Sequence, residues 1–206
     1  KKVRLKQAGR GGIGTVFRNK KIKALVCKIP GVKGNLNNVV DLDAIMERGR
    51  RFNREMRELD DKQCQMRQTG TAHLMEIMND HDLLPVMNYK YGSHKDAFRI
   101  DSSVWKRNFT QNVPDGCWIG CNMSCSKGID DYIVQTGQYK GQKVIVDGPE
   151  YENAAGLGAN CGIFNPGHVI ETNFYCDTYG ICTITWSTLT AFIMECYENG
   201  ILNSER

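Results

Sequence analysis

The chain has 206 residues, a formal net charge of +4 and a hydrophobic fraction of 41%. This length suits one domain or somewhat more, and the apolar content is sufficient for a buried core. The mild charge is scattered and not interleaved with aromatic residues, which disfavours a nucleic-acid-binding protein. No apolar run reaches the roughly 18 residues that a membrane helix needs, so we expect no transmembrane segment.

Nine cysteines are the unusual feature of the composition. Their number is odd and no signal peptide is recognisable, so a disulfide framework is not expected. We therefore expect a cytoplasmic protein with reduced thiols, some of them bound to metal. The sequence begins at Lys1 rather than Met and ends just after a helical pattern, so we expect an internal piece of a longer protein.

Residues 1–29 are predicted to form β-structure interrupted by the glycine turn GRGGIG at residues 9–14. Residues 22–29 alternate in polarity, as a half-buried strand does. Clustered glycines let a ligand approach the backbone and offer N–H groups to phosphate, and Arg10 strengthens this anion-binding interpretation. The spacing fits neither the P-loop nor the dinucleotide fingerprint, so a plain turn stays open as the alternative.

The rest of the chain is predicted to be mainly helical. The first helix begins at Asp41, which can cap its first turn, and the last spans about residues 183–199. Two short strands, at 132–134 and 144–146, flank a glycine-rich turn. Apolar residues at helical spacing predict a core-facing stripe on the first helix (Leu42, Ile45, Met46, Phe52, Met56 and Leu59) and another on the last (Trp186, Leu189, Ile193 and Cys196).

Three cysteines, Cys117, Cys121 and Cys125, have C-x3-C-x3-C spacing. Thiolates suit zinc or iron–sulfur clusters. Because a closed zinc site usually contains C-x2-C pairs, three cysteines in one loop and a distant fourth favour a [4Fe–4S] cluster. The alternative is three buried thiols on one helix stripe, although Pro114 and Gly120 disfavour a regular helix.

Two carboxylates, Glu150 and Glu152, follow Pro149, which suits the first position of a helix. In a first turn they either favour the helix dipole or, beside a cofactor, act as a general base. Further along, His168 and Glu171 have H-x2-E spacing on one helix face. They are either a metal-binding pair or a surface pair.

Several stretches carry a resemblance when they are taken together: GRGGIG at 9–14, GPEYE at 148–152, LGANCGI at 157–163, CDxxG at 176–180 and AFIME at 191–195. In this order they resemble the tungsten-containing aldehyde:ferredoxin oxidoreductase family. Family members are longer, so the chain looks like their middle third. The resemblance implies a mostly α fold with a short N-terminal β segment. Residues 1–29 would end a pterin-binding β-domain, and residues 30–206 would form an incomplete α-helical domain that binds the cluster and pterins.

The resemblance also implies cofactors and roles. Tungsten, with molybdenum left open, would be held by the dithiolenes of two pterins, and a [4Fe–4S] cluster would relay electrons singly. Glu152, with Glu150 beside it, would act as acid/base, and Glu171 resembles a carboxylate that some members use for an additional interface metal. The remaining residues carried over are the cluster ligands Cys117, Cys121 and Cys125, the pterin-phosphate contacts Arg10, Gly11 and Gly12, and the second-pterin contacts Asp177 and Ile181.

The sequence departs from the family pattern in three places. The first two cysteines are spaced C-x3-C rather than C-x2-C, and the family's fourth cysteine falls beyond Arg206. Where the family reads Asp-x2-Gly-Leu-Asp, this chain ends the motif with Cys182. Cys182 is either a small buried residue or a direct ligand to tungsten.

Three functions follow as hypotheses. The leading one is a tungsten-bispterin, [4Fe–4S] oxidoreductase of an anaerobe, which couples aldehyde and carboxylic acid to ferredoxin or to an iron–sulfur subunit. Cys182 motivates the second, the tungsten subunit of an ATP-independent benzoyl-CoA reductase, with an acyl-CoA substrate. The third is a non-catalytic zinc or iron–sulfur module. We expect an oligomer that binds no nucleic acid.

Overall fold

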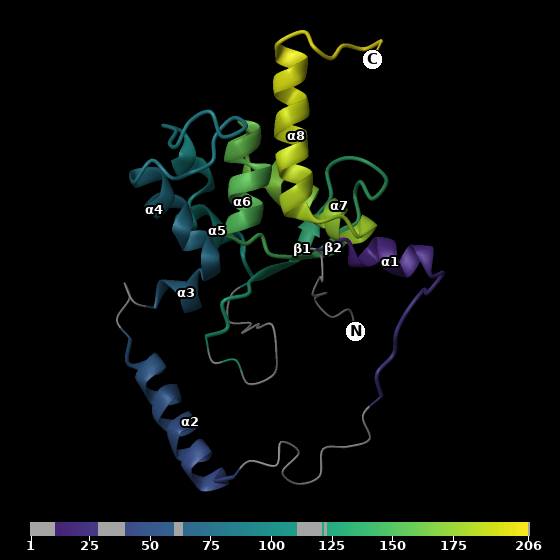
Figure 1. The fold of residues 1–206 in the computed structure, drawn as a ribbon. Helices are drawn as coiled ribbons and strands as arrows, with labels where there is room; N and C mark the ends of the chain where they lie inside the picture. Colours follow the sequence, from purple (N-terminus) through teal and green to yellow (C-terminus); the bar gives the residue numbers. More distant parts are fainter. Residues whose placement is uncertain (1–10, 29–39, 60–63, 111–120, 122, 206) are drawn as a thin grey trace. The chain divides into compact units, whose positions relative to one another are not determined.

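The computed structural model describes residues 11–28, 40–59, 64–110, 121 and 123–205 (Figure 1). The chain divides into two compact units, one built from residues 11–64 and one that contains residues 65–206. Helices dominate both units, so the predicted mostly helical class is confirmed. No helix in these ranges is long and apolar enough to cross a membrane.

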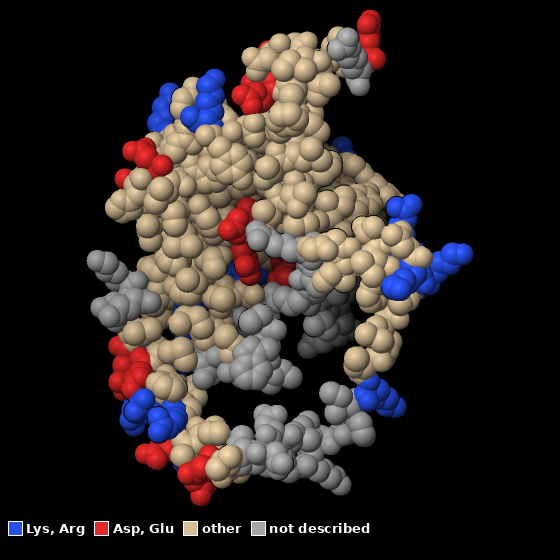
Figure 2. Space-filling model, viewed as in Figure 1, with Lys and Arg blue, Asp and Glu red and all other residues tan. Residues whose placement is uncertain are grey.

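The unit of residues 11–64 contains two helices, α1 (Ile13–Asn19) and α2 (Leu42–Arg57). Asp41 caps α2 as predicted, because its Oδ1 accepts a hydrogen bond from the N–H of Ala44 at 2.9 Å. The predicted core stripe on α2 is wrong: the helix has no buried residue, and Phe52 is 50% exposed. Acidic and basic side chains are interspersed over α2 (Figure 2), among them the pair Arg51–Glu55 at 3.3 Å.

The strand expected at residues 22–29 is not present in the described part of this segment, residues 22–28. The preceding residues, 13–19, form α1 instead of β-structure. A strand is completed by main-chain hydrogen bonds to a neighbouring strand, and alternating polarity alone supplies no such partner.

The unit of residues 65–206 packs helices against one β-hairpin. Its strands, β1 (Gly128–Ile133) and β2 (Lys143–Asp147), are antiparallel and match the predicted pair. The helical elements are α3 (Gln65–Gln68), η1 (Gly70–His73), α4 (Leu74–Asp80), η2 (Ala97–Ile100), α5 (Ser102–Asn108), α6 (Tyr151–Leu157), η3 (Ala159–Cys161), α7 (Pro166–Tyr179) and α8 (Thr183–Glu198).

The core of this unit lies where α4, α5, α6, α7 and the hairpin meet. Trp105 on α5 is fully buried, and its Nε1–H donates to the carbonyl of Ile100 at 2.7 Å, so its one polar atom is satisfied. Met75, Leu157 and Ile170 bring α4, α6 and α7 to the same cluster. Burial of these large side chains is the main stabilising term of the unit.

α6 and α8 lie side by side (Figure 1) and approach closely through small residues. A Cβ on Gly156 would lie 2.4 Å from Oγ of Ser187. The residues that α8 buries are Ser187, Ala191 and Cys196. The predicted stripe on α8 is therefore wrong apart from Cys196; of its other members, Leu189, for example, is 48% exposed.

A tight turn joins α7 to α8. Gly180 is left-handed (φ 69°). The N–H of Ile181 donates to the carbonyl of Cys176 at 2.8 Å, and the N–H of Gly180 donates to the carbonyl of Asp177 at 3.3 Å. These two bonds define a Schellman motif, which satisfies carbonyls at the end of α7 and reverses the chain. Cys182 follows immediately as the N-cap residue of α8.

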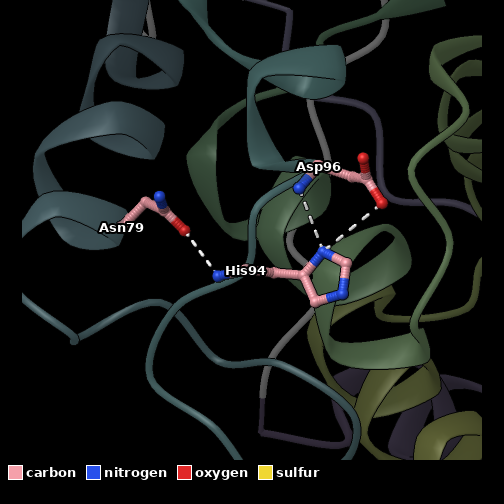
Figure 3. A network of polar contacts seen from close by, with 3 residues as sticks. All are labelled: Asn79, His94 and Asp96. Carbon is pink, nitrogen blue, oxygen red and sulfur yellow. Dashed lines mark hydrogen bonds and ion pairs between the residues drawn. The ribbon is translucent and has the colours of Figure 1, made fainter.

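The segment between α4 and η2 is held by polar contacts of His94 (Figure 3). The main-chain N–H of His94 donates to Oδ1 of Asn79 at 2.9 Å, and Nδ1 of His94 accepts from the N–H of Asp96 at 3.1 Å. The imidazole stacks on Phe164 with ring centroids 4.3 Å apart. These contacts hold residues 94–96 against α4 and Phe164.

Candidate active site

The cysteine segment and the GPEYE motif, which the sequence places some 25 residues apart, adjoin in the structure. The N–H of Gly148 donates to the carbonyl of Lys127 at 2.8 Å. Oγ of Ser126 donates to Oε1 of Glu150 at 3.4 Å. The residue directly after Cys125 thus contacts the N-cap residue of α6.

The start of η1 completes this junction. Oγ1 of Thr71 accepts a hydrogen bond from the N–H of Tyr151 at 3.0 Å. Gly70 is left-handed (φ 76°), and a Cβ there would lie 2.4 Å from the carbonyl oxygen of Cys125. Only glycine permits both the backbone conformation and this approach. Neither Thr71 nor Gly70 was predicted as a site residue.

The two carboxylates have different surroundings. Glu150 is the N-cap of α6 in a capping box with Asn153, whose Oδ1 accepts from the N–H of Glu150 at 3.3 Å. Pro149 therefore precedes the cap, and its predicted place as the first helical residue is wrong. Glu152 lies in the first turn and is exposed. Glu150 is engaged in holding the helix start, whereas Glu152 is accessible to a ligand.

Tyr151, between the two carboxylates in sequence, is half-buried. Burial raises the pKa of the Tyr151 phenol, and the nearby Glu152 and Tyr89 raise it further. The phenol is therefore neutral at neutral pH and can donate a hydrogen bond.

A buried amide network holds the first turn of α6. Nδ2 of Asn153 donates to Oδ1 of Asn173 at 2.7 Å and to Oγ1 of Thr183 at 2.8 Å. Nδ2 of Asn173 donates to the carbonyl of Asp147 at 2.6 Å. Asn173 is 1% exposed, so these bonds offset the cost of burying its amide. The network joins α6, α7, α8 and the end of β2.

Two of the three predicted cluster ligands lie in the described residues. Cys121 and Cys125 are half-buried, and Oγ of Ser124 donates to the carbonyl of Cys121 at 3.1 Å. Cys117 lies outside the described residues. Within them, no three His, Cys, Asp or Glu side chains gather as a metal-binding group. The thiol pair fits a thiolate-bound cluster in donor chemistry, and the ligand set stays a prediction.

The α7–α8 turn brings together the residues predicted to border a pterin. Asp177 and Cys182 are half-buried, and Ile181 is 40% exposed. Burial raises the pKa of the neighbouring Cys176 thiol to about 11, with smaller contributions from Asp177 and Cys182. Cys182 therefore lies near Cys176, beside the predicted pterin contacts.

Two of the predicted pterin-phosphate residues, Gly11 and Gly12, belong to the unit of residues 11–64. Gly11 (φ 81°) and Gly12 (φ 68°) are left-handed and exposed, and a Cβ on either would meet nothing within 4 Å. Their backbone is accessible to a ligand. Arg10 lies outside the described residues.

Glu171 on α7 is 7% exposed, and both of its oxygens accept hydrogen bonds. Oε2 accepts from the N–H of Gln135 at 2.8 Å and from Tyr132 at 3.2 Å, and Oε1 accepts from the N–H of Thr136 at 2.8 Å and from its hydroxyl. Burial alone raises the carboxyl pKa, but these bonds outweigh it and the net pKa is lowered. They favour a role for Glu171 in anchoring the hairpin over one as a metal ligand.

Glu171 contributes to the pKa shifts of two neighbouring groups, Tyr132 and His168. Burial, followed by the Glu171 charge and hydrogen bond, raises the pKa of Tyr132 to about 12. Burial lowers the pKa of His168 and outweighs the opposite effect of Glu171. His168 is thus uncharged at neutral pH, and its Nε2 lies 3.4 Å from Oγ1 of Thr172.

Comparison with known proteins supports the family inferred from these motifs. The sequence profile of aldehyde ferredoxin oxidoreductase, domains 2 and 3, matches residues 47–206. The tungsten-containing aldehyde ferredoxin oxidoreductases of Pyrococcus horikoshii and Pyrococcus abyssi are 33% and 32% identical over 201 residues. The WOR-like subunit of the aliphatic sulfonate oxidoreductase of Pyrococcus furiosus is 28% identical over 203 residues. Each match covers 96% of this chain and 30% of the relative's length. The chain belongs to the aldehyde ferredoxin oxidoreductase family.

Proposed function

We propose that the protein containing this chain is a tungsten-dependent oxidoreductase that converts an aldehyde and water to a carboxylic acid, two protons and two electrons. The observation that carries this proposal is the junction of the Cys121–Cys125 segment with α6, which exposes Glu152 beside it. Relatives that match almost the whole chain are named for this activity.

The residues present suit the cofactors that this reaction needs. Cys121 and Cys125, with Cys117, would hold a [4Fe–4S] cluster, because thiolates are its usual ligands. The accessible backbone at Gly11 and Gly12 suits a phosphate. Asp177 and Ile181 would border a second pterin. When bound, the tungsten–pterin group would take two electrons from the substrate, and the cluster would pass them singly to ferredoxin or to an iron–sulfur subunit.

The chain's own residues position the substrate and move a proton. Glu152 is exposed and takes up a proton released in the reaction. Glu150, through Ser126 and Asn153, keeps the first turn of α6 against the cysteine segment. Removing the proton acceptor of such a reaction typically costs about 10²–10⁴-fold in rate.

The test uses the full-length protein, produced anaerobically with tungstate. Glu152→Gln is expected to lower kcat with aldehydes about 10²–10⁴-fold while the melting temperature is retained. Glu150→Gln, the matched control at the same helix start, is expected to lower the melting temperature. Equal activity of wild type and Glu152→Gln would contradict the assigned role. Zinc without tungsten and iron in elemental analysis would instead support a non-catalytic module.

Cys182 favours a second candidate, reduction of the aromatic ring of an acyl-CoA. Its thiol is half-buried at the N-cap of α8, near the predicted pterin contacts Asp177 and Ile181. A thiolate ligand would occupy a position on the metal and alter the chemistry. Assays with benzoyl-CoA, an aldehyde and an aliphatic sulfonate separate these substrates. A tungsten absorption edge that does not change in Cys182→Ala would exclude the ligand role.

A further inference from the structure

Lys127 directly follows the cysteine segment, and its side chain folds back onto that segment. Its Nζ donates to the carbonyl of Ser124 at 2.6 Å and lies 3.5 Å from the carbonyl oxygen of Ser126. Ser124 and Ser126 are the residues on either side of Cys125. The ammonium group of Lys127 therefore contacts the main chain immediately before and immediately after one predicted cluster ligand.

The backbone and the aliphatic stem of Lys127 are also held, so the position of its charge is defined. The main-chain carbonyl accepts a hydrogen bond from the N–H of Gly148 at 2.8 Å. A Cβ on Gly70 would lie 3.2 Å from Cγ of Lys127 and 2.4 Å from the carbonyl oxygen of Cys125. The lysine stem and the Cys125 carbonyl thus pack together against the start of η1, and Lys127 is half-buried there.

Ser124 has a backbone conformation that requires support from its surroundings. Its φ is 47°, in the left-handed region that is unfavourable for most L-residues. Its Oγ donates to the carbonyl of Cys121, and its own carbonyl accepts from Lys127. Residues in such conformations persist only where neighbouring contacts impose them, and they gather at functional sites. Lys127 supplies one of these contacts, between the two cysteines Cys121 and Cys125.

A positive charge fixed beside a cluster ligand has a defined electrostatic effect. Reduction adds one electron to a [4Fe–4S] cluster, and the net charge and hydrogen bonds around it set its reduction potential. A nearby ammonium group favours the more negative, reduced cluster. Because Lys127 is half-buried, water and salt screen its charge less than they screen a charge on the open surface.

We propose that Lys127 is a positioning residue of the [4Fe–4S] site, which holds the main chain around Cys125 and raises the reduction potential of the cluster. This rests on the proposed function, in which Cys121 and Cys125 are cluster ligands. With the higher potential, the cluster accepts an electron from the tungsten–pterin group more readily. A lysine that only tied the segment together would act through its hydrogen bond, and removal of its charge alone would leave the potential unchanged.

The variants that separate these two roles are made in the full-length protein, produced anaerobically with iron and tungstate. Lys127→Gln removes the charge but keeps an N–H donor, whereas Lys127→Arg keeps both. Lys143→Gln is the matched control, because the same charge is lost from an exposed position at the far end of the hairpin, opposite Ile133. Iron content and melting temperature are measured for each variant.

The cluster is then titrated with reductant at controlled potential and followed by electron paramagnetic resonance. At the potential that half-reduces the wild-type cluster, Lys127→Gln is expected to lower the ratio of reduced to oxidised cluster about tenfold, the order of effect of one unit charge in a partly buried site. Lys127→Arg and Lys143→Gln are expected to keep the wild-type ratio.

An unchanged ratio in Lys127→Gln, or an equal fall in Lys127→Arg or Lys143→Gln, would overturn the proposal. Loss of iron from Lys127→Gln but not from Lys127→Arg would support it through the binding of the cluster, and equal loss of iron from both would overturn it. A wild type that binds no iron would refute the proposed function itself. That result is distinct from a bound cluster whose potential does not depend on Lys127.

Discussion

Helices α2 and α7 show opposite relations between sequence pattern and burial. α2 has a strong apolar stripe, yet none of its residues is buried in the structure. α7 has no distinct apolar stripe, yet it buries Val169, Ile170, Glu171, Asn173 and Cys176. Two of those five side chains are polar.

The difference lies in hydrogen bonding. On α7, Glu171 accepts from the hairpin loop and Asn173 connects Asp147 with Asn153, so a polar side chain can be buried at little cost. On α2, Arg51 and Glu55 pair within the helix, and nothing in the described part of residues 11–64 covers the apolar side. Apolar periodicity therefore predicts only that a helix face is suited to burial. On α7, hydrogen-bond partners allow two polar side chains to be buried as well.

Among the polar contacts, the largest expected effect is at Glu171. Glu171→Ala leaves the N–H groups of Gln135 and Thr136 and the Thr136 hydroxyl without their Glu171 acceptor, whereas the Tyr132 hydroxyl keeps the Gly167 carbonyl at 3.3 Å. We expect a loss of about 3 kcal/mol in the free energy of unfolding, measured by urea denaturation. Hydrogen bonds to a charged acceptor contribute roughly 1.5–3 kcal/mol each, and water replaces part of this at the exposed Gln135 and Thr136. A loss below about 0.5 kcal/mol would mean that α7 is held by its apolar residues alone, and the contrast with α2 would fail.

The next effect tests close packing rather than polarity. Gly156→Ala would bring a Cβ to 2.4 Å from Oγ and 2.9 Å from Cβ of Ser187, so α6 and α8 must separate. We expect a loss of about 2 kcal/mol, as is typical of overpacking. Ser187→Gly in the same chain should restore part of it, since it removes both opposing atoms; no rescue would show that the strain lies elsewhere.

The sequence predicted much of this fold, and the failures have identifiable causes. Caps and breakers placed the start of α2, the bounds of α8 and the hairpin to within a few residues. Burial on α8 was mispredicted because its buried residues include Ala191 and Ser187, which packs against Gly156, and such small residues carry no periodic apolar signal.

The site was predictable in part. Short motifs identified the cysteine segment and Glu152, but only the fold shows that Ser126 bonds Glu150. The three left-handed residues Met87, Asn88 and Tyr89 depend on hydrogen bonds to η3, some 70 residues away in sequence, and no local pattern of residues 86–91 indicates this turn.

A pH titration isolates the charge on Glu171. Its folded-state pKa is lowered from 4.5, because the hydrogen bonds from Thr136, Gln135 and Tyr132 outweigh the burial that would raise it. The charge therefore stabilises the fold fully above about pH 4.5, and the contribution disappears as the pH falls through the lower folded-state value. The unfolding free energy of wild type minus that of Glu171→Gln should be flat near neutrality and decrease in acid. A difference that grows in acid would reverse the assigned sign.

The smallest expected effect is on α2, at Phe52. Phe and Ser have similar helix propensities, so Phe52→Ser reports burial rather than helix formation. Phe52 is 50% exposed and its ring contacts only the Arg51 guanidinium, at 4.9 Å, among the contacts the structure describes for it. Urea denaturation of this chain should show a change within about 0.5 kcal/mol. Ile170→Ser on α7, where the side chain is 2% exposed, should cost about 3 kcal/mol or more. Comparable losses at both positions would show that the α2 stripe is covered in solution, and the two helices would then obey the same rule.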